Sequence, residues 1–107
     1  MIESKYQAEL IDRLKNVYFP GCIVLKNDTD YQQGIPDLTV LYGRYWAFLE
    51  VKRSENSRQQ PNQEYFVDLA DSMSFGSFIS PETEEAVIYE LQLAFGSRWS
   101  PRLSQRK

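Results

Sequence analysis

Two acidic residues and a lysine, Asp37, Glu50 and Lys52, stand at the ends of two apolar segments that could pair as a β-hairpin. If Gly43-Arg44 is a two-residue turn, with the glycine supplying the positive φ of a type II′ turn, Asp37 and Glu50 are directly opposite each other. Their Cβ atoms would then lie about 4.5–5.5 Å apart. Lys52, two residues past Glu50, points to the same face. The spacing therefore predicts a pair of carboxylates beside a lysine.

Both faces of this hairpin are otherwise apolar. One face carries Leu38, Val40, Ala47 and Leu49, and the other carries Leu41, Trp46 and Phe48. Such strands are expected in the middle of a sheet that is covered on both sides. Opposed, partly desolvated carboxylates are unfavourable there unless a cation lies between them. The alternatives are a different register, or strand ends that reach solvent, and the spacing alone leaves them open.

The residue types restrict the metal and the chemistry. The chain has no histidine and one cysteine, Cys22, which excludes Ser-His and Cys-His triads, histidine-ligated zinc and a disulfide framework. Cys22 lies in an apolar run and is expected to be a small buried side chain. A metal site would therefore use oxygen ligands, which favours Mg²⁺ or Mn²⁺.

A further carboxylate could come from the first helix. Glu3 lies on the same stripe as the apolar residues Tyr6, Leu10, Leu14 and Val17. An acid at the end of a buried face needs a partner, although a solvated acid in a first helical turn is also favourable. Glu9 lies about 120° from Glu3 around the helix and is expected at the surface.

A glutamine opens the second predicted helix. Gln63 aligns with Phe66, Val67 and Ala70, which should face the core. It could position water, a phosphate or Lys52. An ordinary residue at a helix start is the alternative.

These residues need a scaffold that brings them together. The chain suits one domain by length. Periodicity and turn signals predict a helix over 3–17, strands over 22–26, 37–41 and 46–51, a helix from Pro61 to 72, a strand over 75–79, and a helix from Ser80-Pro81-Glu82 to near Gly96. The order α-β-β-β-α-β-α predicts an α/β fold with a mixed sheet (α+β).

Charge and hydropathy bear on partners and location. The net charge is −3, yet Lys52, Arg53 and Arg58 cluster, as do Arg98, Arg102, Arg106 and Lys107 in the tail. We expect a domain over 1–96 and a basic tail over 97–107. No apolar run approaches the ~20 residues of a membrane span, and the N-terminus lacks a secretion signal, which predicts a cytoplasmic protein.

The motifs together resemble a known family. Gly34-Ile35-Pro36-Asp37, then Glu50-Val51-Lys52, then Gln63 is similar to the PD-(D/E)xK nuclease superfamily. Within it, the chain most resembles the VRR-NUC domain found in phage and in repair nucleases. The opening Glu3-Ser4-Lys5-Tyr6-Gln7 resembles the first-helix signature of that family, a Glu followed four residues later by Gln. The likeness covers about residues 3–91.

The resemblance implies a restriction-endonuclease-like core, similar to Holliday-junction resolvases of phage type, and a Mg²⁺-dependent endonuclease with Mn²⁺ as a substitute. Glu3, Asp37, Glu50 and the Val51 carbonyl would bind metal. Lys52 would be the catalytic lysine and Gln63 an accessory glutamine. We expect structure-selective cleavage of branched or junction DNA. The basic cluster Lys52, Arg53 and Arg58 and the basic tail are expected to contact its phosphates.

One site per chain and 15 aromatic residues, more than a small core readily hides, predict a homodimer. The alternatives are a non-catalytic nucleic-acid-binding or assembly domain that keeps the nuclease fold, and a nuclease subunit with a larger protein partner.

Overall fold

The computed structural model describes residues 2–96. They form α1 (Glu3–Arg13), the π-helical turn η1 (Leu14–Tyr18), β1 (Ile23–Lys26), β2 (Leu38–Tyr42), β3 (Tyr45–Val51), α2 (Pro61–Met73), β4 (Gly76–Ile79) and α3 (Glu84–Ala94). The predicted order of helices and strands is confirmed. The basic tail over 97–107, expected to contact phosphates, lies outside the described residues.

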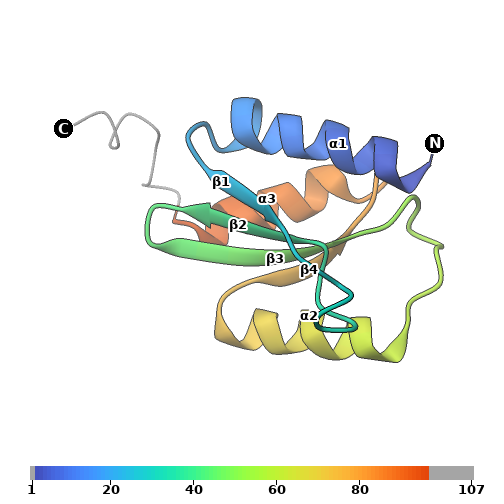
Figure 1. Ribbon diagram of the computed structural model, residues 1–107. Coiled ribbons are helices and arrows are strands. Elements are labelled where there is room, and N and C mark those ends of the chain that lie inside the picture. The colour runs from blue at the N-terminus through green and yellow to red at the C-terminus, as the bar shows by residue number, and fades with distance from the viewer. Residues whose placement is uncertain (1, 97–107) are drawn as a thin grey trace.

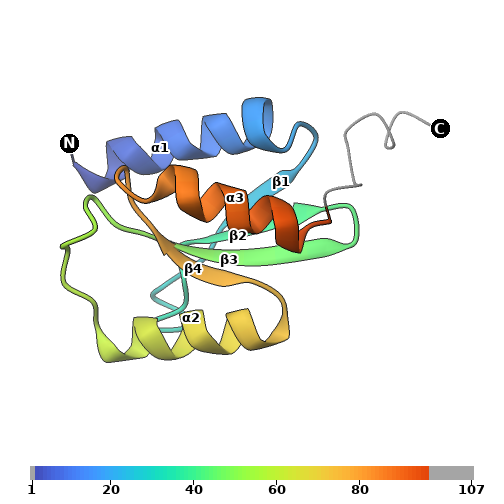
Figure 2. The same ribbon diagram turned by 180° about the vertical axis from the view of Figure 1, so that it is seen from behind.

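The strands form one mixed sheet in the order β1-β2-β3-β4. The pairs β1–β2 and β2–β3 are antiparallel, whereas β4 runs parallel to β3, because the crossover through α2 returns the chain to the opposite end of the sheet. Helices α1 and α3 cover one face, and α2 covers the other (Figures 1 and 2). The first turns of α1 and α2 both lie at the end of the sheet where β3 ends (Figure 1).

The β2–β3 hairpin has the predicted register, which runs from the turn to Leu38 opposite Leu49. Gly43 has a φ of +64°, and Arg44 has no positive φ, as a type II′ turn requires. The two strands occupy the centre of the sheet. The predicted central position is therefore confirmed, whereas the side that faces α2 is covered only in part, because Leu41, Trp46 and Phe48 are half-buried.

The core lies between the sheet and the α1/α3 layer. It takes alternate residues from the hairpin, and the helices contribute the other side chains: Leu38, Val40, Ala47, Leu49, Val51, Tyr6, Leu10, Leu14, Ile88, Leu91 and Phe95. Cys22 is also buried, as expected. Because side chains alternate along a strand, Glu50 points to the opposite face, toward α2.

The first α-helix is shorter than predicted, and a π-helical turn follows it. The α-helix stops at Arg13, and the N–H of Phe19 donates to the carbonyl of Leu14 at 2.9 Å, an i→i+5 bond. This wider turn shifts the angular spacing of the side chains. Val17, predicted on the buried stripe, is therefore 63% exposed, whereas Tyr18 packs against the core.

The third helix starts later than predicted, at Glu84. The N–H of Ser80 donates to Oγ1 of Thr83 at 3.0 Å, and the N–H of Thr83 donates to the carbonyl of Ser80 at 3.1 Å. Ser80 thus closes a separate turn instead of capping the helix. In residues 2–96 no helix combines the length and the apolar character needed to cross a membrane.

Candidate active site

Asp37 and Glu50 meet at the open end of the β2–β3 hairpin. The backbone N–H of Asp37 donates to Oε1 of Glu50 at 3.2 Å, and the N–H of Val51 donates to Oδ2 of Asp37 at 3.0 Å. Each carboxylate is therefore held by the backbone of the opposite strand. The structure brings the two acids together, one residue beyond the last pair of the ladder.

Burial makes the negative charge of this pair costly. Glu50 is 3% exposed, and burial, followed by the charge of Asp37, raises its pKa from 4.5 to about 7. Burial also raises the pKa of Asp37, although the Val51 hydrogen bond and the charge of Lys52 oppose the rise. Lys52 Nζ lies 3.7 Å from Oε2 of Glu50. Two neighbouring acids whose pKa values are both raised favour the binding of a cation.

Gln63 joins the lysine to the acid. Its Nε2 donates to Oε2 of Glu50 at 2.8 Å, and its Oε1 accepts a hydrogen bond from Lys52 Nζ at 2.8 Å. The Lys52 ammonium also donates to the carbonyl of Arg58 at 3.2 Å. Lys52 is 8% exposed, so its long side chain is held in one place and its charge is directed at the acidic pair.

The start of α2 fixes Gln63. Pro61 stands at the first helical position, where the missing N–H costs nothing. The N–H of Gln60 donates to Oε1 of Gln63 at 3.1 Å. The same oxygen thus accepts from the helix terminus and from Lys52, and the terminus of α2 becomes part of the site.

The loop before β2 is held against α2. Gly34 has a φ of +90°, and a Cβ atom there would lie 2.4 Å from Cβ of Asn62, so only glycine allows this approach. Asn27 ties the loop ends together: its Nδ2 donates to the Pro36 carbonyl at 2.8 Å and its N–H to the Asp37 carbonyl at 2.8 Å. Sequence patterns did not single out Asn27 or Asn62.

The first helix reaches the same end of the sheet. Glu3 lines a pocket of about 620 Å³ together with Asp37, Glu50 and Gln63. Glu3 is an exposed residue. Partial burial of its carboxylate and the nearby charge of Asp37 nevertheless raise the pKa of Glu3, whereas the charges of Lys52 and Arg53 oppose this rise. Glu9, half-buried, lines a different pocket.

The donor set suits a hard cation, although it is incomplete as it stands. Within residues 2–96, no group of three or more Asp, Glu, Cys or His side chains is close enough together to hold a metal ion. Asp37 and Glu50 nevertheless form an adjacent oxygen pair, and Oδ1 of Asp37 accepts no hydrogen bond from the described residues. The pair fits Mg²⁺ or Mn²⁺, which commonly keep several waters. Val51 contacts Asp37 through its N–H.

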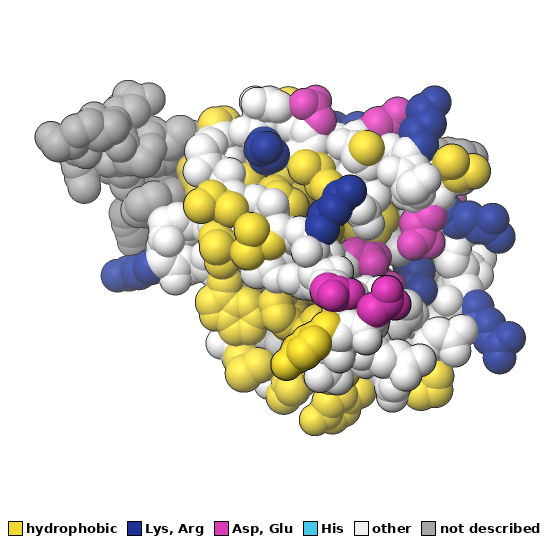
Figure 3. Space-filling view, viewed as in Figure 1, with side chains coloured by type: hydrophobic (Ala, Val, Ile, Leu, Met, Phe, Trp, Pro, Cys, Tyr) yellow, Lys and Arg dark blue, Asp and Glu magenta, His cyan; other side chains and the backbone are white. Residues whose placement is uncertain are grey.

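The two arginines of the predicted DNA-binding cluster are exposed. Arg53 and Arg58 follow β3 in the segment that leads to α2. Only the carbonyl of Arg58 takes part in the contacts around Lys52. Acidic and basic side chains gather at this end of the molecule (Figure 3). Both side chains are therefore accessible to solvent, and their predicted contact with phosphates stays a prediction.

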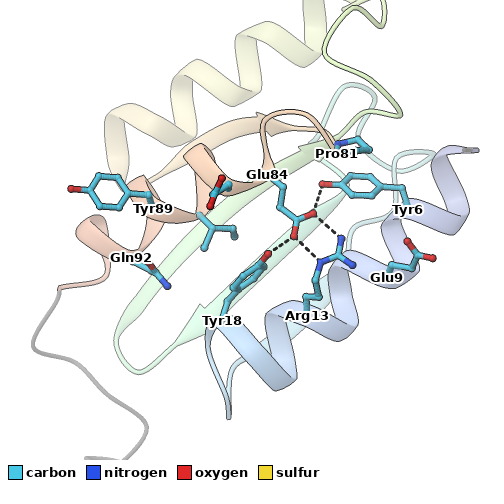
Figure 4. A pocket seen from close by; sticks show the side chains of 10 residues that line it. Tyr6, Glu9, Arg13, Tyr18, Pro81, Glu84, Tyr89 and Gln92 are labelled. Carbon is cyan, nitrogen blue, oxygen red and sulfur yellow. Dashed lines mark hydrogen bonds and ion pairs between the residues drawn. The ribbon is translucent and has the colours of Figure 1, made fainter.

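A second pocket, about 660 Å³, lies between α1 and α3. The carboxylate of Glu84 lies in its wall and accepts several hydrogen bonds (Figure 4). Arg13 donates to Glu84 through Nε and Nη2, both at 2.7 Å, and the hydroxyls of Tyr6 and Tyr18 donate to the same carboxylate. Burial would raise the pKa of Glu84, but the hydrogen bonds from Arg13, Tyr18 and Tyr6 lower it overall. This cluster ties the two helices together, and nothing in the sequence distinguished Glu84 from other acids.

Solved structures resemble this fold, among them two VRR_NUC proteins. One, described as a VRR_NUC domain, has a TM-score of 0.66 and 26% identity and covers 81% of this chain and 94% of its own. The other, a VRR_NUC domain protein, has a TM-score of 0.67 and 17% identity and covers 88% and 90%. No family model and no curated protein matches the chain. The predicted resemblance to VRR-NUC, a PD-(D/E)xK family, is confirmed over most of the chain, and this fold implies a nuclease.

Proposed function

We propose that this protein is a metal-dependent endonuclease that hydrolyses phosphodiester bonds in DNA at the pocket lined by Asp37, Glu50 and Gln63. The observation that carries the proposal is the contact of Gln63 with both Glu50 and Lys52, each at 2.8 Å. The contact supports the proposal because it holds the ammonium of Lys52 3.7 Å from Glu50, an acid that lines the open pocket, while Lys52 itself lies behind the pocket wall and lines a neighbouring cavity. The likeness to VRR_NUC domains supports the same chemistry.

The acidic residues would hold the metal. Asp37 and Glu50 are the central ligands, with Glu3 and the Val51 carbonyl as the further candidates, and Mn²⁺ could replace Mg²⁺. When bound, such an ion polarises the scissile phosphate and lowers the pKa of a water molecule. Binding would also offset the burial and the repulsion by Asp37, which together raise the pKa of Glu50.

Lys52 would act on the reacting atoms. Its ammonium is held by Gln63 and by the Arg58 carbonyl, so it can orient the attacking water or stabilise charge on the phosphate oxygens. The water oxygen forms a bond to phosphorus, the bond from phosphorus to the leaving oxygen breaks, and the water proton leaves with solvent or the leaving group. No covalent intermediate with the protein is needed.

The substrate proposed is branched or junction DNA, cut by a homodimer. Severing two strands requires two sites, and one chain carries one. The α2-facing side of the edge strand β1 supports a dimer, because Ile23 and Leu25 are both exposed there. Hydrophobic side chains gather on this side of the sheet (Figure 3). Sedimentation velocity, with Leu25→Lys as the variant, would separate dimer from monomer, and a wild-type monomer with and without DNA would refute it.

The activity is tested on paired duplex, forked DNA and a four-way junction, with Mg²⁺ and with EDTA. Asp37→Ala, Glu50→Ala and Lys52→Ala should each abolish cleavage while circular dichroism stays native. Asp68→Ala and Lys15→Ala change exposed residues of the same types outside the pocket and should cleave normally. Wild-type cleavage by two of the site variants, or DNA binding by the wild type with no cleavage of any substrate, would reject the proposal.

A further inference from the structure

Tyr31 presents an aromatic ring to solvent. It is 88% exposed, the highest value among the large hydrophobic side chains of residues 2–96. A tyrosine that only filled space would bury part of its ring, because a buried aromatic contributes strongly to stability. In this loop the ring gains nothing from the fold.

The loop that carries Tyr31 is nevertheless well organised. Oδ1 of Asp28 accepts the N–H of Asp30 at 2.9 Å and of Tyr31 at 3.3 Å. The Asp28 carbonyl accepts the N–H of Tyr31 at 3.2 Å and of Gln32 at 3.3 Å. Together with the packing of Gly34 on α2, these bonds fix the backbone beneath the ring. A fixed backbone lowers the entropy that a contact through Tyr31 would cost.

The position of the ring connects it to the pocket. Asp30, Gln33 and Gly34, on either side of Tyr31 in the sequence, all line the pocket that contains Asp37 and Glu50. Tyr31 itself does not line that pocket. The loop that forms part of the pocket wall therefore also carries the exposed ring, which lies outside the lining of the candidate active site.

The surrounding charge indicates which part of DNA the ring contacts. Asp28 and Asp30 precede Tyr31 in the same loop, and their negative charges disfavour an approaching phosphate. A nucleobase is uncharged and has an aromatic face, and it stacks on an exposed tyrosine when it is unpaired. We propose that Tyr31 is a stacking platform for an unpaired nucleobase beside the cleaved bond. The inference rests on the proposed nuclease function and specifies its substrate as DNA with at least one unpaired nucleotide next to paired DNA.

The test measures binding with the full chain and with Ca²⁺ in place of Mg²⁺, after a gel has verified that the DNA stays intact. The probes are a forked DNA with 2-aminopurine at successive unpaired positions and a fully paired duplex of equal length. Tyr31→Ala removes the ring, and Tyr31→Phe keeps it. Tyr89→Ala removes another exposed tyrosine, 62% accessible, from α3, in the layer on the other face of the sheet, and is the matched control.

Tyr31→Ala should weaken binding of the fork by about 5- to 150-fold, which corresponds to stacking on one base, and should lose the fluorescence quenching at one position. Tyr31→Phe and Tyr89→Ala should behave as wild type, and binding of the paired duplex should be unchanged throughout. Wild-type affinity and quenching in Tyr31→Ala would overturn the inference while leaving the nuclease proposal standing. A wild-type protein that neither binds nor cleaves any DNA would overturn both.

Discussion

The ammonium of Lys52 lies 2.8 Å from Oε1 of Gln63, so a residue of helix α2 fixes the position of a lysine that belongs to the central hairpin. Gln63 reaches Glu50 through its other amide atom. The lysine and the acid are therefore positioned by one side chain that does not itself need to touch DNA.

We expect Gln63→Ala to lower the rate of cleavage by about 10- to 100-fold, the range seen when a partner of a metal ligand is removed. Lys52 and Glu50 would each lose a hydrogen bond, while the hairpin keeps its register. Single-turnover kinetics at saturating Mg²⁺ and DNA measures the effect. Gln59→Ala, at an exposed position before the helix, is the control, and an unchanged rate in Gln63→Ala would contradict a positioning role.

The acidic pair should make the metal-free protein less stable as pH rises. The pKa of Glu50 is raised to about 7 in the folded state, so folding favours its protonated form, and stability falls as pH rises from about 4.5 to 7. The loss is at most about 3 kcal/mol. Urea unfolding in EDTA between pH 5 and 8 measures it.

Asp37→Asn tests the source of this loss. Removing one charge should raise the Tm at pH 8 in EDTA, because the repulsion with Glu50 disappears while the amide oxygen can still accept the Val51 N–H. The same variant should gain less stability from Mg²⁺ than the wild type does. A lower Tm than wild type in EDTA would show that the pair is not strained by its charge.

Glu84→Gln should destabilise the fold by about 2 kcal/mol, since it weakens charge-assisted hydrogen bonds from Arg13, Tyr6 and Tyr18. The pKa of Glu84 is lowered in the folded state. Its contribution is therefore fully present above about pH 4.5 and is lost as pH falls through the lowered pKa. Denaturant unfolding at pH 7 and pH 3 should show the difference from wild type shrinking, and Glu85→Gln, an exposed neighbour, should show none.

Glu3 and Glu9 offer a paired test of the first helix. Glu3→Gln should weaken Mg²⁺ binding and slow cleavage strongly, because Glu3 lines the pocket of Asp37 and Glu50. Glu9→Gln should change neither, because Glu9 lines the pocket between α1 and α3. Isothermal titration with Mg²⁺ and cleavage assays decide between them, and the reverse pattern would reassign the third ligand.

The exposed arginines should set the salt dependence of DNA binding. Replacing Arg53 and Arg58 by glutamine should reduce the slope of log K against log salt by about 2, one unit for each phosphate contact. Deleting residues 97–107 should reduce it further. Fluorescence anisotropy at several salt concentrations measures the slope, and equal slopes in wild type and both variants would remove these residues from the interface.

Local signals were enough to predict the hairpin. The positive φ of Gly43 is compatible with only a few turn types. Once the turn type is known, the strand register places Asp37 opposite Glu50. The Pro61 helix start followed from local chemistry in the same way. The Glu84 cluster could not be predicted, because it depends on partners more than 60 residues away. The exposure of Val17 was also missed, since the π-turn that causes it has no pattern in the sequence that we recognised.

The candidate site lies at one end of the sheet. Helix α1, on one face, contributes Glu3, and helix α2, on the other face, contributes Gln63 (Figure 1). A nascent chain that has just completed its hairpin already carries Asp37, Glu50 and Lys52, yet Gln63 still has to emerge and its helix to dock. The full rate of hydrolysis would then be reached only once the second helix has docked. Such an order of assembly would keep an incomplete polypeptide from nicking DNA during its own synthesis.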